Sequence, residues 1–379
     1  MDRGHVRKRA VGLCAAAAAA AMAGVLPAAA STGGGGSFIG GLNTVKTVAS
    51  TVPGSGSGAG DVNPYGVAIV PKSHGTLTAG DVLVSNFNDS ANLQGTGTTI
   101  VEISPGGQQK VFATIPPKYA PVGLTTALVA LRSGWVIVGS LPTTDGMSDT
   151  MQPGELFVLD SGGHVRKVIT GYGIDGPWDA TALDLGSYAD LFVSNVLNGI
   201  VNGMPSPTTN GNVVRLNLNL TGAVPKVTSS TVIANGIPVH TDPAALIVGP
   251  TGVALGPDGT LFVADTVNSR IAGVPDAVFR HTPVNAGAPA ATVFANRPNA
   301  KGPLNGPLGL VLTPNGTLLA ASGGDNNLVE FTQGGKLVTV KNVDTADPPG
   351  GALFGLATAT YPNRVYFVND DTNTLNVLR

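Results

Sequence analysis

Short runs of apolar residues, separated by Gly, Pro, Asn and Asp, recur along this chain. The clearest copy spans residues 249–275, where two apolar runs flank Pro257-Asp258-Gly259 and a polar loop leads to a third run. Apolar runs of about four to eight residues between such turn residues predict β-strands. The pattern therefore predicts many short strands joined by tight turns.

Five weaker copies of this pattern make six repeats in all. Their first strands start near residues 64, 121, 177, 250, 307 and 353. Their second strands are nearly continuously apolar, as expected for strands that are buried on both faces, and they lie at residues 81–86, 134–139, 190–195, 260–265, 317–322 and 364–369. The spacing of 46 to 73 residues is somewhat longer than the period of about 40–50 that is typical of propeller blades.

The sixth repeat ends at Arg379 after its third strand. Residues 43–51 resemble the outer strands of the other repeats, so we expect them to complete the last sheet and close a ring. The alternative is that residues 43–51 are a disordered leader. We expect a short linker over residues 31–42 and a single domain over residues 43–379.

The sequence Asp-Thr-Val-Asn-Ser-Arg-Ile of residues 265–271, after Gly-Pro-Asp-Gly-Thr-Leu-Phe-Val-Ala, resembles the NHL repeat family. The next best copy covers residues 307–330. The resemblance implies an all-β, six-bladed β-propeller with four antiparallel strands per blade. It implies no single activity, because NHL-like propellers include binding scaffolds, lyases and lactonase-type hydrolases.

The composition agrees with such a fold, and the N-terminal residues indicate where in the cell the protein would be found. Charged residues make up only 12% of the chain, and Gly (53) and Pro (28) are abundant, so long helices are not expected. Residues 1–30 hold a basic start, an Ala-rich apolar run and Ala28-Ala29-Ala30, the order of a secretory signal peptide. A membrane anchor is the alternative, but the run is short and Ala-rich for one. We expect a bacterial protein, secreted or periplasmic, cleaved after Ala30.

Cleavage would remove four basic side chains, one acidic side chain and the single cysteine, leaving 17 Lys and Arg against 22 Asp and Glu. With a net charge of −5 and no basic stripe, nucleic-acid binding is not expected. No disulfide and no membrane span would remain. We expect a monomer whose partner is a small molecule, a glycan or a protein.

In a ring of this kind, the loops between second and third strands share a rim with the entries into the first strands, where related enzymes carry their sites. Here these loops are long in blades one to three, and the entry at residues 235–250 is long too. They predict a wall or partial lid over the channel; the alternative is surface decoration. The polar and aromatic candidates on this rim are Asn63, Asn86, Ser140, Trp178, Asp179, Asn195, Asp265, Asn369 and Asp370.

An oxygen-rich ring of this kind could hold Ca²⁺ or another divalent cation, although Asn and Asp also favour turns without any ligand. No cofactor is assured by the sequence. Asp179 differs from the other candidates, because it stands where most repeats have Gly. Resemblance to gluconolactonases and senescence-marker proteins implies a metal held by Glu, Asn and Asp, and here only Asp265 matches. Asp179 and Asp265 are therefore the metal candidates, while Asp265, Asn268 and Arg270 together also indicate a turn lock.

His240 is the only histidine that maps to this rim, with Asp242 close by. It could act as a general acid or base near pH 7, or it could be a solvated loop residue. Trp178 could bind a ligand or pack between blades. We expect an exported scaffold that binds a ligand or protein on the rim with the long loops. The alternative is a metal-assisted lyase or lactonase-type hydrolase with its site in the channel, so whether the protein is an enzyme stays open.

Overall fold

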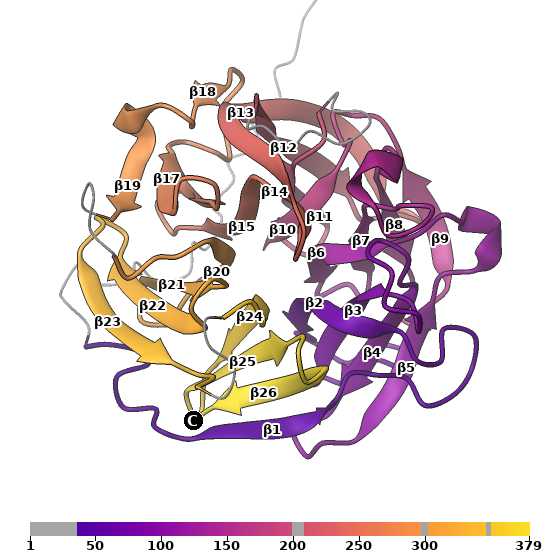
Figure 1. The fold of residues 1–379 in the computed structure, drawn as a ribbon. Helices are drawn as coiled ribbons and strands as arrows, with labels where there is room; N and C mark the ends of the chain where they lie inside the picture. Colours follow the sequence, from indigo (N-terminus) through magenta and orange to yellow (C-terminus); the bar gives the residue numbers. More distant parts are fainter. Residues whose placement is uncertain (1–35, 199–207, 297–301, 346–349) are drawn as a thin grey trace, which may run out of the picture.

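The computed structural model describes residues 36–198, 208–296, 302–345 and 350–379, and the predicted signal peptide lies outside them. Within these residues six antiparallel sheets stand around a central channel, as predicted (Figure 1). In each sheet the first four strands follow one another from the channel outward in chain order, except that in blade 6 the outermost strand comes from the N-terminus. The fold is an all-β, six-bladed β-propeller.

Blades 1 to 3 are formed by β2 (Val62–Ile69), β3 (Val82–Asn88), β4 (Thr99–Ile103) and β5 (Gln109–Thr114); β6 (Leu124–Ala130), β7 (Val136–Ser140), β8 (Glu155–Leu159) and β9 (Val165–Ile169); and β10 (Pro177–Asp184), β11 (Tyr188–Asn195), β12 (Thr208–Asn219) and β13 (Lys226–Asp242). Blade 3 also carries β14 (Leu246–Val248) and β18 (Val284–Asn285). Single 3₁₀ turns occur at Pro117–Tyr119, Ser148–Thr150 and Pro289–Ala291.

Blades 4 to 6 are formed by β15 (Pro250–Leu255), β16 (Leu261–Asp265), β17 (Arg270–Val274) and β19 (Thr292–Ala295); β20 (Pro307–Leu312), β21 (Thr317–Ser322), β22 (Asn327–Thr332) and β23 (Leu337–Asn342); and β24 (Leu353–Ala359), β25 (Arg364–Asn369), β26 (Thr374–Leu378) and β1 (Val45–Ser50). Second strands such as β3, β7, β16 and β21 are buried along their whole length. Their continuous apolar runs reflect burial between neighbouring blades, as expected.

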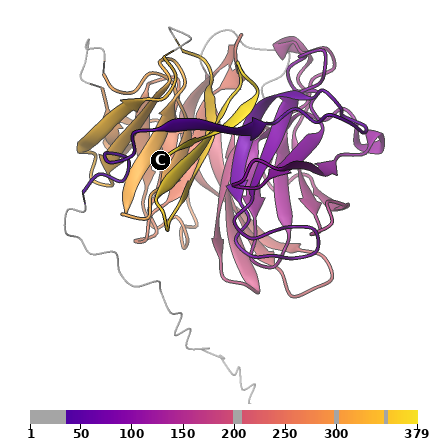
Figure 2. The same ribbon diagram turned by 90° about the horizontal axis from the view of Figure 1, so that it is seen from below.

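The N-terminal strand closes the ring, as predicted. β1 pairs antiparallel with β26, with Val45 opposite Leu378 and Ser50 opposite Thr374. Figure 2, which views the ring edge-on, shows β1 lying across the front beside the C-terminal strand. The outer edge of blade 6 is therefore paired rather than open.

The segment just before β1 is more than a linker. Phe38 and Ile39 are buried in a cluster with strands of blades 5 and 6. Their backbone N–H groups donate to the buried carboxylate of Glu330, at 2.7 Å from Phe38 and 3.2 Å from Ile39. Residues 36–42 are thus docked on the ring by apolar burial and by charge-assisted hydrogen bonds.

Every first strand carries a β-bulge where it faces the channel, seen as a register shift near its start. Gly occupies the bulge in four blades because the next first strand passes close by. A Cβ built on Gly252 would lie 2.4 Å from the Leu310 nitrogen, and one on Gly309 would lie 2.4 Å from the Phe354 oxygen. Adjacent first strands therefore pack backbone against backbone.

Blades 2 and 3 depart from this rule. Strand β6 begins at Leu124, a few residues after the expected start near 121, and its bulge is one residue longer, with Ala127 at the glycine position. In blade 3 the same position is held by Asp179. The one large polar side chain at these six positions thus lies on the channel wall.

Candidate functional site

The channel mouth on the predicted rim is closed by a hairpin. β13 pairs with β12 over most of its length, and its last residues, His240 to Asp242, pair with Val248 to Leu246 of β14. Figure 1 shows β14 inside the ring. The buried side chains of Ala245, Leu246, Ile247 and Val248 belong to one apolar cluster with first strands of several blades. The long entry at residues 235–250 therefore forms a plug rather than a wall around an open channel.

Aromatic side chains lie directly beneath this plug. Tyr65 stacks between Phe87 and Phe354, with ring centroids 4.4 Å and 4.0 Å away. Trp178 packs beside them, 6.1 Å from Tyr65, and its Nε1–H donates to the Ile247 carbonyl oxygen at 3.0 Å. Trp178 is thus a packing residue that anchors the hairpin, which is the second of the two roles considered for it.

Most of the predicted polar rim residues bond to their own blade. Asn86 Nδ2 donates to Thr99 Oγ1 at 3.1 Å within blade 1, and also to the carbonyl of Thr51, just after β1, at 3.0 Å. Ser140 Oγ accepts from the Gly123 N–H at 3.2 Å. Asn195 Oδ1 accepts from the Asp175 N–H, and Asn369 Oδ1 accepts from the Thr372 N–H. All four side chains are buried. Their place at the ends of second strands suits turns and blade contacts rather than a shared ligand.

Asp265 is held inside blade 4. Its Oδ2 accepts from Arg270 Nε at 2.7 Å and from Asn268 Nδ2 at 2.9 Å, and its Oδ1 accepts from the Asn268 N–H at 3.2 Å. The ion pair is almost fully buried, with 0% exposure for Asp265 and 7% for Arg270. Arg270 also donates to backbone oxygens of the β17–β19 connection, such as Ala286 at 2.6 Å. This is the turn lock that the sequence indicated.

A small polar group is enclosed under the hairpin. The Asn63 side chain and the Tyr65 hydroxyl are buried next to each other. Burial, together with the negative charges of Asp370 and Asp242, raises the pKa of Tyr65 well above its ordinary value. Asn63 and Asp370, two of the predicted rim residues, therefore lie near each other, but beneath the plug.

His240 lies on the part of β13 that forms the hairpin. Its Nδ1 is 2.7 Å from the Thr241 carbonyl oxygen, and a carbonyl only accepts, so Nδ1 carries a proton. The nearby Asp242 Oδ1 accepts from the Ala244 and Ala245 N–H groups at 2.8 Å and 3.0 Å, which fixes the hairpin turn. His240 is half-buried and lines neither of the two cavities described below.

The described residues bring together no group of three or more His, Cys, Asp or Glu side chains that could hold a metal ion. The two metal candidates do not converge. Asp265 bonds to Arg270 within blade 4, whereas Asp179 Oδ2 accepts from the Val253 N–H at 3.0 Å across the blade 3–blade 4 contact. The described donors therefore do not fit the three-residue metal set that the lactonase resemblance implied.

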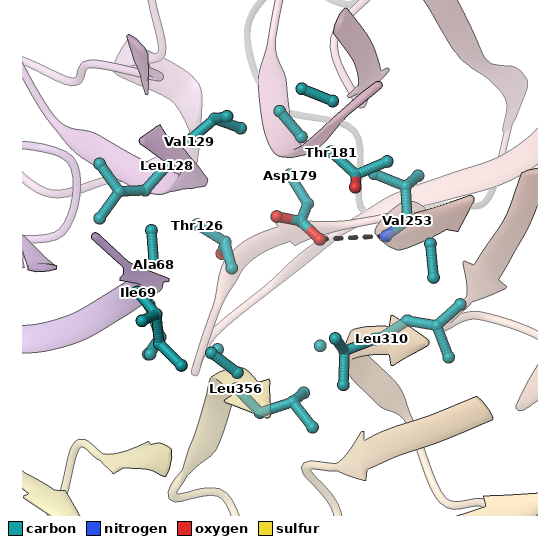
Figure 3. Close-up of a pocket in the computed structure, with 18 of the residues that line it drawn as sticks. Ala68, Ile69, Thr126, Leu128, Val129, Asp179, Thr181, Val253, Leu310 and Leu356 are labelled. Atoms are coloured by element: carbon teal, nitrogen blue, oxygen red, sulfur yellow. Dashed lines mark hydrogen bonds between the residues drawn. The ribbon is translucent and has the colours of Figure 1, made fainter. Parts of the chain in front are cut away.

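Asp179 lies in a cavity inside the ring. The cavity has a volume of about 320 Å³ and is lined by first-strand residues of all six blades, mainly Val, Ile, Leu and Ala (Figure 3). Burial raises the pKa of Asp179 to about 8, against the lowering effect of the Val253 and Ala180 N–H groups. The lining runs toward the ends of the first strands, at Ile69, Leu131, Asp184 and Leu312, so it opens at the rim opposite the hairpin.

A second cavity lies on the predicted rim, between blades 1 and 2. This rim groove has a volume of about 640 Å³ and is lined by Ser57, Gly58, Thr96, Thr98, Thr114, Ile115, Pro116, Pro117, Ala120, Pro121, Val122, Thr143 and Thr144. Four separate segments of the chain contribute residues to the groove, so no local sequence motif predicts it. The one sequence signal is the cluster of prolines at 116, 117 and 121, which the candidate residues did not include.

No helix among the described residues is both long and apolar enough to cross a membrane.

Comparison with known proteins agrees with the fold. The NHL repeat family matches residues 248–273. A search of the curated proteins finds no match. Among solved structures, a gluconolactonase from Xanthomonas campestris is similar, with a TM-score of 0.53, 15% identity, and coverage of 89% of this chain and 90% of that one.

Two other solved enzymes are similar as well. A luciferin-regenerating enzyme gives a TM-score of 0.52 and 11% identity over 88% of this chain and 94% of that one. Virginiamycin B lyase from Staphylococcus aureus gives a TM-score of 0.49 and 15% identity over 89% and 85%. At such identities the likeness concerns the fold alone, and the chain is a six-bladed propeller with an NHL repeat in blade 4.

Proposed function

We propose that this protein is an exported binding scaffold that holds a ligand or a protein segment in the rim groove between blades 1 and 2. The observation that carries the proposal is the groove itself, which lies on the rim built from the long loops of blades 1 and 2. Its volume of about 640 Å³ falls within the range of about 300–1,000 Å³ that is usual for ligand pockets.

The threonines of the groove hold its walls in place. Thr114 Oγ1 donates to the Ser57 carbonyl at 3.0 Å, Thr96 Oγ1 to the Leu93 carbonyl at 2.6 Å, and Thr143 Oγ1 to the Gln94 carbonyl at 2.5 Å. The Thr143 bond ties the β7–β8 loop to the β3–β4 loop, the Thr114 bond ties the end of β5 to the segment before β2, and the Thr96 bond holds the β3–β4 loop itself. A groove whose walls are already fixed binds a partner without the entropy cost of ordering its loops.

The chemistry of the groove indicates what it would bind. None of its described lining residues is charged, and buried Ile115 and Val122 lie among proline rings and threonine side chains. Each threonine oxygen that donates its proton to a carbonyl can still accept a hydrogen bond from a ligand. The groove therefore suits an uncharged partner with apolar surface and N–H or O–H donors, such as a peptide segment or a glycan.

The hairpin extends this surface. Gln94 Nε2, from the β3–β4 loop, donates to the Pro243 carbonyl at the hairpin turn with a length of 2.7 Å. The loops of blade 1 and the plug of blade 3 thus form one continuous rim. The lyase or lactonase alternative has no comparable observation, because the described metal candidates do not meet and His240 lies in neither cavity.

The test is a binding screen with a groove-blocked variant. A glycan array and a displayed peptide library would be probed with the wild type, with Ala120→Arg, which places a long side chain in the groove, and with Ser187→Arg on the opposite rim as the matched control. We expect probes that bind the wild type to lose at least tenfold in affinity for Ala120→Arg and to bind Ser187→Arg unchanged. Equal binding to both variants, or no binding to either library, would contradict the proposal.

A further inference from the structure

We propose that the cavity inside the ring is a second binding site, which takes a small protonated amine with an aliphatic body. It is distinct from the rim groove, because the two cavities share no lining residue and open at opposite rims. Three features of the cavity carry the proposal: an apolar wall, a single deep carboxyl and a buried hydroxyl.

The wall determines the body of the ligand. First-strand side chains such as Val67, Leu128, Leu310 and Leu356 surround the space on all sides (Figure 3). Several of them, including Ile69, Val129 and Leu312, are only partly buried, because they face the open channel. A short alkyl chain that covers these side chains gains about 25 cal/mol for each Å² of apolar surface removed from water.

The charges of the lining determine the head group. Among the described residues of the lining, Asp179 and Asp184 are the only ionisable side chains, and both are acidic. Both belong to β10, and the first strands of the other five blades contribute no ionisable side chain to the lining. Asp184, nearer the open end, already accepts from the Arg132 N–H at 2.6 Å and the Gly186 N–H at 2.8 Å. The deep Asp179 is therefore the group that a cation would meet.

Two oxygen-bearing side chains at the deep end of the cavity, Asp179 and Thr126, can accept hydrogen bonds from a ligand. Asp179 Oδ2 is bonded to the Val253 N–H, while Figure 3 shows the other carboxyl oxygen directed into the cavity on the side of Thr126. The Thr126 hydroxyl is buried with no hydrogen-bond partner among the described residues, and the residue is only 4% exposed. An ammonium group carries three N–H donors, and the Asp179 carboxyl oxygen that faces the cavity and the Thr126 oxygen can each accept a hydrogen bond from it.

Asp179 also lowers the stability of the folded protein, because its carboxyl is buried. Its position is glycine in four blades and alanine in another, so the propeller does not need a carboxyl there. In the part of the chain that the structure describes, no cationic side chain offsets its burial, and its pKa is raised to about 8. Active sites are where burial shifts the pKa values of titratable groups most strongly, so a carboxyl with a raised pKa that faces a cavity is a candidate for a binding role.

Binding would be linked to a proton. In the empty cavity near pH 7, Asp179 is mostly the neutral acid; an ammonium ligand favours the carboxylate, and the released proton passes to the buffer. The affinity should therefore rise roughly tenfold per pH unit below about pH 8 and level off above it. The amine itself stays protonated up to about pH 10.

The experiment is a calorimetric titration of the full chain with n-pentylammonium chloride, with n-pentanol as the neutral ligand of the same length. We expect the amine to bind at least tenfold more tightly than the alcohol at pH 8, and to release close to one proton at pH 7 in buffers of different ionisation enthalpy. Equal affinity for the two ligands, no proton release, or no binding of the amine would overturn the proposal.

Variants assign the effect to the cavity. Asp179→Asn should weaken amine binding at least tenfold and abolish proton release, and Thr126→Val, which keeps the shape and removes the hydroxyl, should weaken it several-fold. Asp258→Asn, in an exposed turn between β15 and β16, removes the same charge elsewhere and should change nothing. Unchanged binding by Asp179→Asn would refute the site, whereas the rim groove would be untouched by that result.

Discussion

Asp179 is an acidic residue at a position where the other blades have small residues. At the equivalent position of four other blades, glycine lets the neighbouring first strands touch. Asp179 instead extends its carboxyl and bonds to the Val253 N–H of the next blade, which keeps the two strands linked. The hydrogen bond offsets only part of the desolvation of the carboxyl, so its pKa stays high.

This conflict predicts that Asp179→Asn stabilises the protein in a pH-dependent way. In the unfolded chain the carboxyl ionises near the ordinary Asp pKa of 3.8, whereas in the folded chain it stays neutral up to about pH 8. The wild type therefore loses stability relative to the variant as the pH rises from about 4 to about 8. At pH 7 the gain for Asp179→Asn should be about 4 kcal/mol.

Urea unfolding of both proteins at pH 4, 6 and 8 measures this gain. The asparagine oxygen can still accept from the Val253 N–H, so the contact between blades is kept in the variant. Asp258→Asn serves as the control and should show no comparable pH dependence, because its side chain is exposed. A gain that does not grow with pH would show that Asp179 ionises without penalty in the folded protein.

At the residue scale the sequence singled out Asp179 but not the residues that surround it. Asp179 was recognisable because it breaks a repeat of glycines. Thr126 was not, because it reaches the cavity only through the longer bulge of blade 2, which the spacing near residue 121 did not reveal. Asp265 was grouped with Asp179, although its carboxylate bonds to Arg270 inside its own blade.

At the scale of elements, the hairpin of β13 and β14 decides which end of the channel is open. Blade 3 has an outer strand of 17 residues, far longer than the others, and its end turns inward to plug the mouth. Leu246 in the hairpin has φ of 64°, a conformation that a leucine adopts only when its surroundings hold it there. The anchors are the apolar cluster and the hydrogen bond from Trp178 to the Ile247 carbonyl.

We predict that Trp178→Phe loosens this hairpin. The variant keeps an aromatic ring but leaves the Ile247 carbonyl without its donor, which should cost on the order of 1–2 kcal/mol. Compared with the wild type, the variant should exchange the amide hydrogens of residues 245–248 faster, while the rest of the ring keeps its exchange rates.

The chain holds a second tryptophan that serves as the matched control. Trp135 packs at the edge of another apolar cluster, and its side chain is only partly buried. Trp135→Phe should leave hydrogen exchange in the hairpin unchanged. Equal protection of residues 245–248 in the wild type and in Trp178→Phe would mean that apolar packing alone holds the plug.

At the scale of the whole molecule, the ring depends on contacts between distant parts of the chain. β1 pairs with β26 across almost the full sequence, and Phe38 and Ile39 dock on the same side next to Glu330. The closing strand joins the last blade to the start of the chain by strand pairing.

Deleting residues 36–51 should therefore lower the melting temperature on the order of 10 °C and promote aggregation through the exposed edge of β26. Scanning fluorimetry with parallel light scattering measures both effects. Lys46→Ala, an exposed change within β1, should leave both signals close to those of the wild type. An unchanged melting temperature after the deletion would show that the closing strand does not stabilise the ring.

The sequence alone determined the six repeats, the buried second strands and the closing strand. These features follow from the local alternation of apolar and turn residues and from a count of strands that left the last blade one short. The two cavities were decided only by the tertiary structure. Each combines side chains from segments far apart in the chain, and the direction in which the long outer strand of blade 3 turns depends on the apolar cluster it meets. A linear pattern records which residues prefer burial, but not which of them meet around a common space.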